Sequence, residues 1–285
     1  MTPRSWLFVP GDRPERFAKA EASGADAVIL DLEDSVSPAH RDHARAAVRK
    51  RLGEPRGPAL LAVRINPPGS AAAAADLAAL ADGPAPGVIV VPKAEGAATL
   101  RDLSARLAGT GLAEAALLPI ATETPRALFQ LGTYRECRER LAGMAWGAED
   151  LSAAIGAEAS READGRFTPP YEMARALALF AAAAAGVPAI ETVWPAFADE
   201  AGLAAFAARA ARDGFAGMLA IHPAQVSVIN AAFTPGAERV DWARRVVAAF
   251  AAAPEAGALQ LDGAMIDAPH LAQARRILAR LGPQA

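Results

Sequence analysis

The sequence lacks the features that mark several large classes of protein. Among its 285 residues there is one cysteine, Cys137, so no disulfide forms within the chain and a cytoplasmic location is expected. Cys137 lies in a charged helical pattern, far from any histidine-rich passage, so a catalytic thiol is not expected either. Basic residues form no long run and the formal net charge is −3, which gives no indication of a nucleic-acid surface.

Long hydrophobic runs are absent as well. The N-terminal run WLFVP is too short for the apolar core of a signal peptide, and charged residues, glycine or proline interrupt the alanine-rich stretches. No membrane span is therefore expected. The motifs GxGxxG, GxxxxGKS/T, HExxH and GxSxG are also missing. Their absence gives no support to a dinucleotide site, a P-loop, a helical zinc site or a nucleophile elbow.

What the sequence does contain is a regular alternation of apolar runs and helical patterns. Eight apolar runs of strand length are separated by helical segments, which predicts a (β/α)8 TIM barrel over residues 1–223. A doubly wound open sheet is the alternative, but it would normally show a glycine-rich turn after an early strand. The expected strands are 5–11, 26–36, 60–66, 87–93, 116–124, 143–150, 187–194 and 215–223.

Residues 224–285 exceed what a barrel needs. Helical patterns at 241–253 and 271–281 flank a segment, 257–270, that has the pattern of a turn or short hairpin. We expect this C-terminal extension to act as a lid or as an oligomer contact.

The predicted strands end in ionisable residues, which matters because the active sites of such barrels lie at the C-terminal ends of the strands. Glu123 and Asp150 follow two successive apolar runs. Two carboxylates brought together suit a hard divalent cation, Mg²⁺ or Mn²⁺. The alternative for Asp150 is that it caps the following helix. The strand-end residues are Asp31, Glu33, Asp34, Arg64, Asn66, Lys93, Glu123, Asp150, Glu191 and His222.

Several short motifs, in the same order, resemble the citrate lyase β-subunit-like family of the HpcH/HpaI aldolase superfamily. The resemblance extends from Arg4 to about residue 280 and implies a barrel with a C-terminal extension. It also implies a Mg²⁺-dependent lyase that cleaves or forms a C–C bond between an acyl-CoA and a 2-oxo acid, in substrates such as malyl-, citramalyl- or citryl-CoA. The motifs include RSWLFVPGDRPERFAKA, DAVILDLEDSV, VRIN, ETPRAL, WGAEDLSAAIGA and GAMIDAP.

The resemblance assigns roles to particular residues. Glu123 and Asp150 hold the metal, and Glu123 also binds substrate. Arg64 binds a substrate carboxylate or stabilises negative charge on the enolate or alkoxide oxygen. The alternative is a salt bridge to Glu33 or Asp34, which is compatible with either role. Asp267 exchanges a proton with the enolate carbon, whereas the residues alone suggest an ordinary turn aspartate.

Two further groups complete the expected site. Asp31, Glu33 and Asp34 orient metal-bound water and hold the neighbouring cations, or else form ion pairs at the rim without a catalytic role. Arg16 and Lys19, just after the first strand, contact the phosphates of coenzyme A, or else form a solvated helix face.

The sequence departs from the family pattern at two positions. Met218 stands where many members have lysine, and Glu191 stands where aspartate is common. These departures bear on the substrate pocket and the coenzyme A contacts. Two alternatives to the lyase remain open: a malyl-CoA-type thioesterase, and a citrate lyase subunit acting on an acyl-carrier-protein thioester. A homo-oligomer, a trimer or a dimer of trimers, is expected by resemblance.

Overall fold

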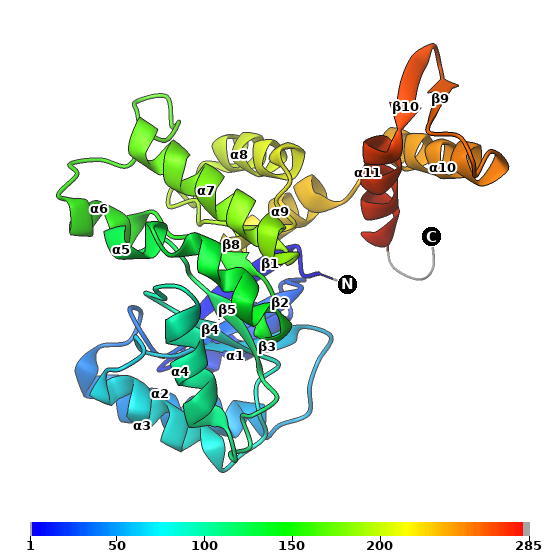
Figure 1. The fold of residues 1–285 in the computed structure, drawn as a ribbon. Coiled ribbons are helices and arrows are strands. Elements are labelled where there is room, and N and C mark those ends of the chain that lie inside the picture. The colour runs from blue at the N-terminus through cyan, green and yellow to red at the C-terminus, as the bar shows by residue number, and fades with distance from the viewer. Residues whose placement is uncertain (1, 282–285) are drawn as a thin grey trace. The chain divides into compact units, whose positions relative to one another are not determined.

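A computed structural model describes residues 2–281 of the chain (Figure 1). These residues form two compact units: Pro3–Asn230, and the described part of Ala231–Ala285 together with Thr2. No helix among residues 2–281 is both long and apolar enough to span a membrane.

The first unit is built around eight parallel strands in the order β5-β4-β3-β2-β1-β8-β7-β6. Backbone bridges from Leu117 to Leu141 and from Ile120 to Ala145 join the two outer strands, β5 and β6. The sheet therefore closes on itself, which confirms the predicted (β/α)8 barrel. The strands are β1 (Ser5–Pro10), β2 (Ala27–Asp31), β3 (Leu60–Arg64), β4 (Val88–Val91), β5 (Ala116–Pro119), β6 (Met144–Ala145), β7 (Ala189–Glu191) and β8 (Gly217–Ala220).

The barrel interior follows from the alternation of side chains along each strand. Trp6, Ile29, Val90 and Leu219 belong to one buried apolar cluster inside the barrel. Asp31 lies two residues beyond Ile29 on β2, so it projects from the same face at the C-terminal mouth. Arg64 likewise lies two residues beyond Ala62 of the same cluster on β3, so it also projects from the inner face at the mouth. The alternation that fills the core thus delivers these two charged groups to the mouth.

Helices cover the outside of the barrel, and the helical segments expected between the strands are present except for one that is broken. The structure adds two helices that the sequence patterns did not predict, α6 and α9. The helices are α1 (Phe17–Glu21), α2 (Arg41–Leu52), α3 (Ala71–Ala81), α4 (Ala97–Leu107), α5 (Pro125–Leu128), α6 (Glu149–Ile155), α7 (Pro169–Ala185), α8 (Glu200–Asp213) and α9 (Gln225–Phe233), with 3-10 helices η1 (Pro14–Arg16), η2 (Pro38–His40) and η3 (Leu131–Arg140).

One predicted helix is wrong. The sequence pattern of residues 125–141 predicts one continuous helix with Pro125 in its first turn, but α5 ends after one turn and η3 is irregular, with non-helical backbone at Cys137. Tertiary contacts hold this segment in place: Tyr134 donates a hydrogen bond to the carbonyl of Ala94 and accepts one from the amide of Gly96. These hydrogen bonds to the loop after β4 therefore override the local helical pattern.

The second unit consists of α10 (Ala237–Ala252), a hairpin of β9 (Ala258–Leu261) and β10 (Ala264–Asp267), and α11 (Ala268–Ala279). The hairpin predicted within 257–270 is confirmed. Its two-residue turn has positive φ at both Asp262 and Gly263, which is the combination a type I′ turn requires. Ala243, Val246, Ile266 and Ala274 form a small core of their own.

Candidate active site at the barrel mouth

Glu123 and Asp150 line one cavity of about 390 Å³ at the C-terminal ends of the strands. Neither is on a strand, which corrects the expected strand ends at 124 and 150. Glu123 lies in the loop between β5 and α5, just before Thr124, the N-cap residue of α5. Asp150 lies in the first turn of α6, where the helix dipole favours a negative charge. The two carboxylates come together as expected, from a loop and a helix start.

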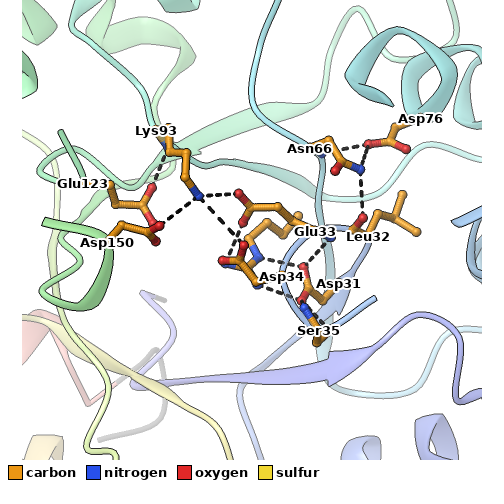
Figure 2. A network of polar contacts seen from close by, with 11 residues as sticks. Asp31, Leu32, Glu33, Asp34, Ser35, Asn66, Asp76, Lys93, Glu123 and Asp150 are labelled. Atoms are coloured by element: carbon orange, nitrogen blue, oxygen red, sulfur yellow. Dashed lines mark hydrogen bonds and ion pairs between the residues drawn. The ribbon is translucent and has the colours of Figure 1, made fainter. Parts of the chain in front are cut away.

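Lys93 connects this pair to the acids in the loop that follows β2 (Figure 2). Its Nζ lies 2.7 Å from Glu33 Oε1 and 3.2 Å from Asp150 Oδ1. Its backbone N–H donates to Glu123 Oε2 over 2.5 Å. This contact requires an uncommon left-handed backbone (φ 50°), which is strained in a non-glycine residue. Lys93 thus contacts the pair through both its main chain and its side chain.

Arg64 is enclosed by three carboxylates. Its Nε and Nη2 donate to the two oxygens of Asp31 at 2.6 and 2.7 Å. Its Nη1 lies 2.8 Å from Glu33 and 3.2 Å from Asp34, and the guanidinium lies over the ring of Phe8 at 4.7 Å. Burial alone would lower the pKa of Arg64, but these carboxylates raise it above its usual range. Arg64 therefore stays charged and is held in one orientation.

The acids of the site differ in their electrostatic surroundings. Burial raises the pKa of Glu123 to about 8; neighbouring Asp150 adds to this effect and Lys93 opposes it. Burial likewise raises the pKa of Glu33 to about 7, against the opposing charges of Arg64 and Lys93. Burial also acts on Asp31, but hydrogen bonds from Arg64 hold its pKa below the usual range.

The donor set of Glu123 and Asp150 fits a hard divalent cation. Within residues 2–281 there is no group of three or more His, Cys, Asp or Glu side chains placed to hold a metal. Mg²⁺ commonly takes one or two protein carboxylates and completes its octahedron with water and substrate oxygens. Asp31, Glu33, Asp34 and Asp150 lie around the two cations Arg64 and Lys93. Burial raises the pKa of Glu123, so a cation next to it would stabilise its ionised form. The metal pair stays a prediction that the geometry supports.

The acids expected to surround the metal pair do lie around Arg64 and Lys93. Asp31 is fully buried and Glu33 is 4% exposed, whereas more than half of the Asp34 side chain is exposed. Besides Arg64, Asp31 accepts hydrogen bonds from the amides of Glu33 and Ser35. These acids therefore form the expected ion pairs, and through them they hold the cations Arg64 and Lys93 in place. Their role in orienting metal-bound water stays a prediction.

Arg16 and Lys19 are exposed on η1 and α1, the segments that follow β1. Their contact with coenzyme A phosphates stays a prediction. Asp267 ends β10 in the second unit and caps α11, and its Oδ1 lies 2.6 Å from His270 Nδ1. This capping matches the alternative of a turn aspartate, and the catalytic role of Asp267 also stays a prediction.

The two departures from the family pattern are neighbours. Glu191 on β7 pairs with Met218 on β8, and both side chains are fully buried. Glu191 accepts hydrogen bonds from Trp146 and from Arg175 on α7. Met218 directly precedes Leu219, whose side chain lies inside the barrel, so the Met218 side chain lies on the outer face of β8. Both side chains thus lie between the strands and the helices, so these positions concern helix packing rather than the lining of the cavity.

Sequence reasoning missed two features of the site. It placed Lys93 at a strand end but gave it no functional role, although a lysine directly after the apolar run VIVVP was the available signal. It gave no role to Gly147 either. A Cβ at that position would lie 3.0 Å from Glu123 Cγ and 3.2 Å from Ile120. The close packing of Glu123 therefore leaves little room for a side chain at this position, a constraint that the sequence pattern does not show.

Residues 4–223 match the family model described as HpcH/HpaI aldolase/citrate lyase. The chain belongs to this family. Among curated relatives, a citrate lyase subunit beta-like protein of Mycobacterium tuberculosis is 41% identical over 281 residues, which is 97% of this chain and 95% of the relative. A (3S)-malyl-CoA thioesterase of Cereibacter sphaeroides is 33% identical, with 97% and 94% covered. The mitochondrial citramalyl-CoA lyase of Mus musculus is 32% identical, with 96% and 85% covered.

A solved structure is similar in fold to this chain. The crystal structure of protein CitE from Mycobacterium tuberculosis, in complex with magnesium, acetoacetate and coenzyme A, superposes with a TM-score of 0.81 at 40% identity. The similarity covers 99% of this chain and 98% of that chain. Family members thus include both lyases and thioesterases of coenzyme A thioesters.

Proposed function

We propose that the protein is a Mg²⁺-dependent carbon–carbon lyase of the oxo-acid-lyase type. It cleaves or forms a 3-hydroxy-3-carboxyacyl-CoA, with an acyl-CoA and a 2-oxo acid as the other partners. The observation that carries the proposal is the pair Glu123–Asp150, which lines the same cavity at the barrel mouth as Arg64. The citramalyl-CoA lyase relative and the magnesium and coenzyme A complex of CitE support the same reading.

In this proposal Glu123 and Asp150 would hold Mg²⁺, which would supply a Lewis acid for the oxo-acid half of the substrate. In the cleavage direction the hydroxyl proton passes to solvent water and the carbonyl of the oxo acid forms as the C–C bond breaks. The electron pair of that bond passes to the thioester as an enolate. The rigidly held cation Arg64 stabilises the developing oxyanion. Asp267 returns a proton to the enolate carbon.

The remaining parts of the proposal concern binding. Exposed Arg16 and Lys19 contact the coenzyme A phosphates, and a homotrimer or a dimer of trimers brings the extension with Asp267 to a neighbouring copy. Light scattering of the purified protein measures the mass of the assembly. A monomeric mass at micromolar concentration would contradict the proposed oligomer but not the coenzyme A contacts.

The thioesterase relative favours a second candidate. In that case water intercepts the acyl group at the same site, and the products are free coenzyme A and a hydroxy diacid.

The test is incubation of the purified protein with malyl-, citramalyl- and citryl-CoA, with Mg²⁺ or with EDTA. An oxo acid released together with an intact acyl-CoA supports the lyase, and free thiol without oxo acid supports the thioesterase. Inactivity towards all three, with activity towards the corresponding acyl-carrier-protein thioester, supports the citrate lyase subunit. Glu123→Ala and Asp150→Ala should each abolish Mg²⁺-dependent turnover with unchanged circular dichroism, and full activity in either variant would contradict the metal pair.

A further inference from the structure

The start of α11 brings a histidine into close contact with an aspartate. β10 leads directly into α11 (Figure 1), Asp267 is the N-cap residue of this helix, and His270 is the third residue inside it. His270 Nδ1 lies 2.6 Å from Asp267 Oδ1, and the backbone N–H of Asp267 is directed at the same nitrogen over 3.3 Å. The Asp267 side chain also accepts a hydrogen bond from the backbone of His270, which completes a capping box.

The two contacts at His270 Nδ1 make opposite demands on this nitrogen. The amide of Asp267 needs a bare Nδ1 as its acceptor, whereas an ionised Asp267 carboxylate needs a proton on Nδ1. A bare Nδ1 and an ionised Oδ1 at 2.6 Å would repel each other through their lone pairs. The shorter contact therefore holds one proton, on Nδ1 or on Oδ1, and it is as short as a charge-assisted hydrogen bond.

A capping box alone does not need a histidine. Glutamate or glutamine normally takes the third helical position and accepts the hydrogen bond of the N-cap amide. In this chain that hydrogen bond is the longer of the two contacts, and the shorter one is made with the carboxylate. Histidine is the side chain that gains and loses a proton near neutral pH. The His270 side chain is 41% exposed and the Asp267 side chain 34%, so the pair can exchange its proton with water.

The proton between the two side chains depends mainly on the pair itself. Within residues 2–281, Asp267 is the one acidic group that pairs with the His270 ring, and β9 and β10 contain no other charged residue. Arg245 on α10 pairs with Asp241 and with Asp262 of the hairpin turn. The charged residues of the two helices are Glu238, Arg239, Asp241, Arg244 and Arg245 on α10, and Arg275 and Arg276 on α11.

We infer that His270 and Asp267 hold one proton between them, and that His270 thereby supplies Asp267 with the proton that the enolate carbon takes up. This inference rests on the proposed lyase function, in which Asp267 protonates the enolate. An aspartate alone is normally ionised at neutral pH and has no proton to give, whereas the histidine beside it keeps one available. His270 is thus a positioning residue that acts through Asp267.

The proton balance of the step is complete. In the cleavage direction the Asp267 carboxyl gives its proton to the enolate carbon, a C–H bond forms, and the pair then takes up one proton from water. In the direction of C–C bond formation the Asp267 carboxylate removes a proton from the carbon next to the thioester, and the pair releases one proton to water. Neither direction needs a further reactant.

His270→Gln separates the proton from the helix cap. Glutamine at this position accepts the N-cap amide as histidine does, so the melting temperature should stay the same, but it carries no titrating proton. For the thioester that the wild type cleaves fastest, we expect kcat to fall by about 100-fold at pH 7, with KM and Mg²⁺ affinity unchanged. The deficit should shrink to about 10-fold at pH 5, because carboxyl groups become protonated there without a partner. Wild-type kcat and pH profile in His270→Gln would overturn the inference.

Two further variants complete the comparison. His43→Gln, at an exposed histidine of α2, is the matched control and should keep the wild-type kcat and pH profile. His270→Ala loses both the cap and the proton, and added imidazole should raise its kcat at pH 7 by about 10-fold. A helix cap alone would not respond in this way, so a rate that imidazole leaves unchanged would count against the inference.

A half-reaction measures the same proton transfer without C–C cleavage. Mass spectrometry follows the uptake of deuterium by the methyl group of acetyl-CoA in D₂O with Mg²⁺, and His270→Gln should slow this uptake by about 100-fold at neutral pH. The double variant His270→Gln/Asp267→Asn should be no slower than Asp267→Asn, because both residues act on one proton. Additive losses would contradict the shared proton.

Failure of the inference is distinguishable from failure of the proposed function. A strongly reduced kcat in Asp267→Asn, together with wild-type behaviour of His270→Gln, would overturn this inference alone. Wild-type kcat in Asp267→Asn would overturn the role of Asp267 in the proposed function and this inference with it. Absence of both C–C cleavage and deuterium uptake in the wild-type protein with Mg²⁺ would overturn the lyase proposal and this inference together.

Discussion

Replacing Glu123 by glutamine should stabilise the metal-free protein at alkaline pH while abolishing its response to Mg²⁺. The Glu123 carboxyl is 4% exposed, and burial beside Asp150 raises its pKa from 4.5 to about 8. The unfolded chain therefore releases this proton at lower pH than the folded protein does. Stability contributed by the protonated group is fully present below pH 4.5, is lost as the pH rises, and is absent above pH 8.

The magnitude follows from the same shift. A pKa raised from 4.5 to about 8 corresponds to at most about 5 kcal/mol between the two protonation states. Glutamine resembles the protonated carboxyl in shape and still accepts the hydrogen bond from the amide of Lys93. For a chain of this size, we expect the melting temperature of Glu123→Gln to exceed that of the wild type by roughly 5–10 °C at pH 8.5.

Calorimetric unfolding in EDTA at pH 4.5, 7 and 8.5 measures this difference. The two proteins should unfold at similar temperatures at pH 4.5 and diverge as the pH rises. Added Mg²⁺ should stabilise only the wild type. Glu158→Gln, at an exposed carboxylate after α6, is the control and should keep the wild-type pH dependence. Equal melting temperatures of Glu123→Gln and the wild type at pH 8.5 would refute the claim that ionisation of the buried Glu123 carboxyl destabilises the metal-free protein.

Three further predictions concern neighbouring residues. Arg64→Lys removes the two-point contact with Asp31 and should lower kcat by about 100-fold, measured at saturating substrate. Gly147→Ala pushes a methyl group against Glu123 and should destabilise the fold by about 1–3 kcal/mol while weakening Mg²⁺ binding in calorimetry. Asp267→Asn keeps a good cap for α11, so it should leave Mg²⁺ affinity and melting temperature unchanged and lower kcat by about 100-fold or more; wild-type kcat would exclude Asp267 as the proton donor.

The barrel and half of the site's geometry were predictable because both depend on strand periodicity. Ala27–Asp31 is buried along its whole length, as a parallel strand covered on both faces must be, and its sequence AVILD shows this directly. The same alternation that places Ile29 inside the barrel brings Asp31 to the mouth. Arg64 follows from β3 by the same reasoning.

The rest of the site depends on local backbone geometry that no periodicity encodes. Lys93 contacts Glu123 through a left-handed residue, and this conformation is specified by its contacts rather than by its side-chain type. Asp150 comes from a short helix whose start falls within the expected strand 143–150. Gly147 was one glycine among 23, and only its distance to Glu123 distinguishes it. These contacts are long-range, so they appear only when the loops are placed in space.

The most direct test of the central claim is the cleavage of citramalyl-CoA by the wild-type protein as a function of Mg²⁺ concentration, with pyruvate, acetyl-CoA and free thiol measured in the same samples. We expect pyruvate and acetyl-CoA to appear in equal amounts, their rate of formation to saturate with Mg²⁺, and EDTA to stop the reaction. Free thiol without pyruvate, or cleavage that EDTA leaves unchanged, would contradict a metal-dependent carbon–carbon lyase at the Glu123–Asp150 site.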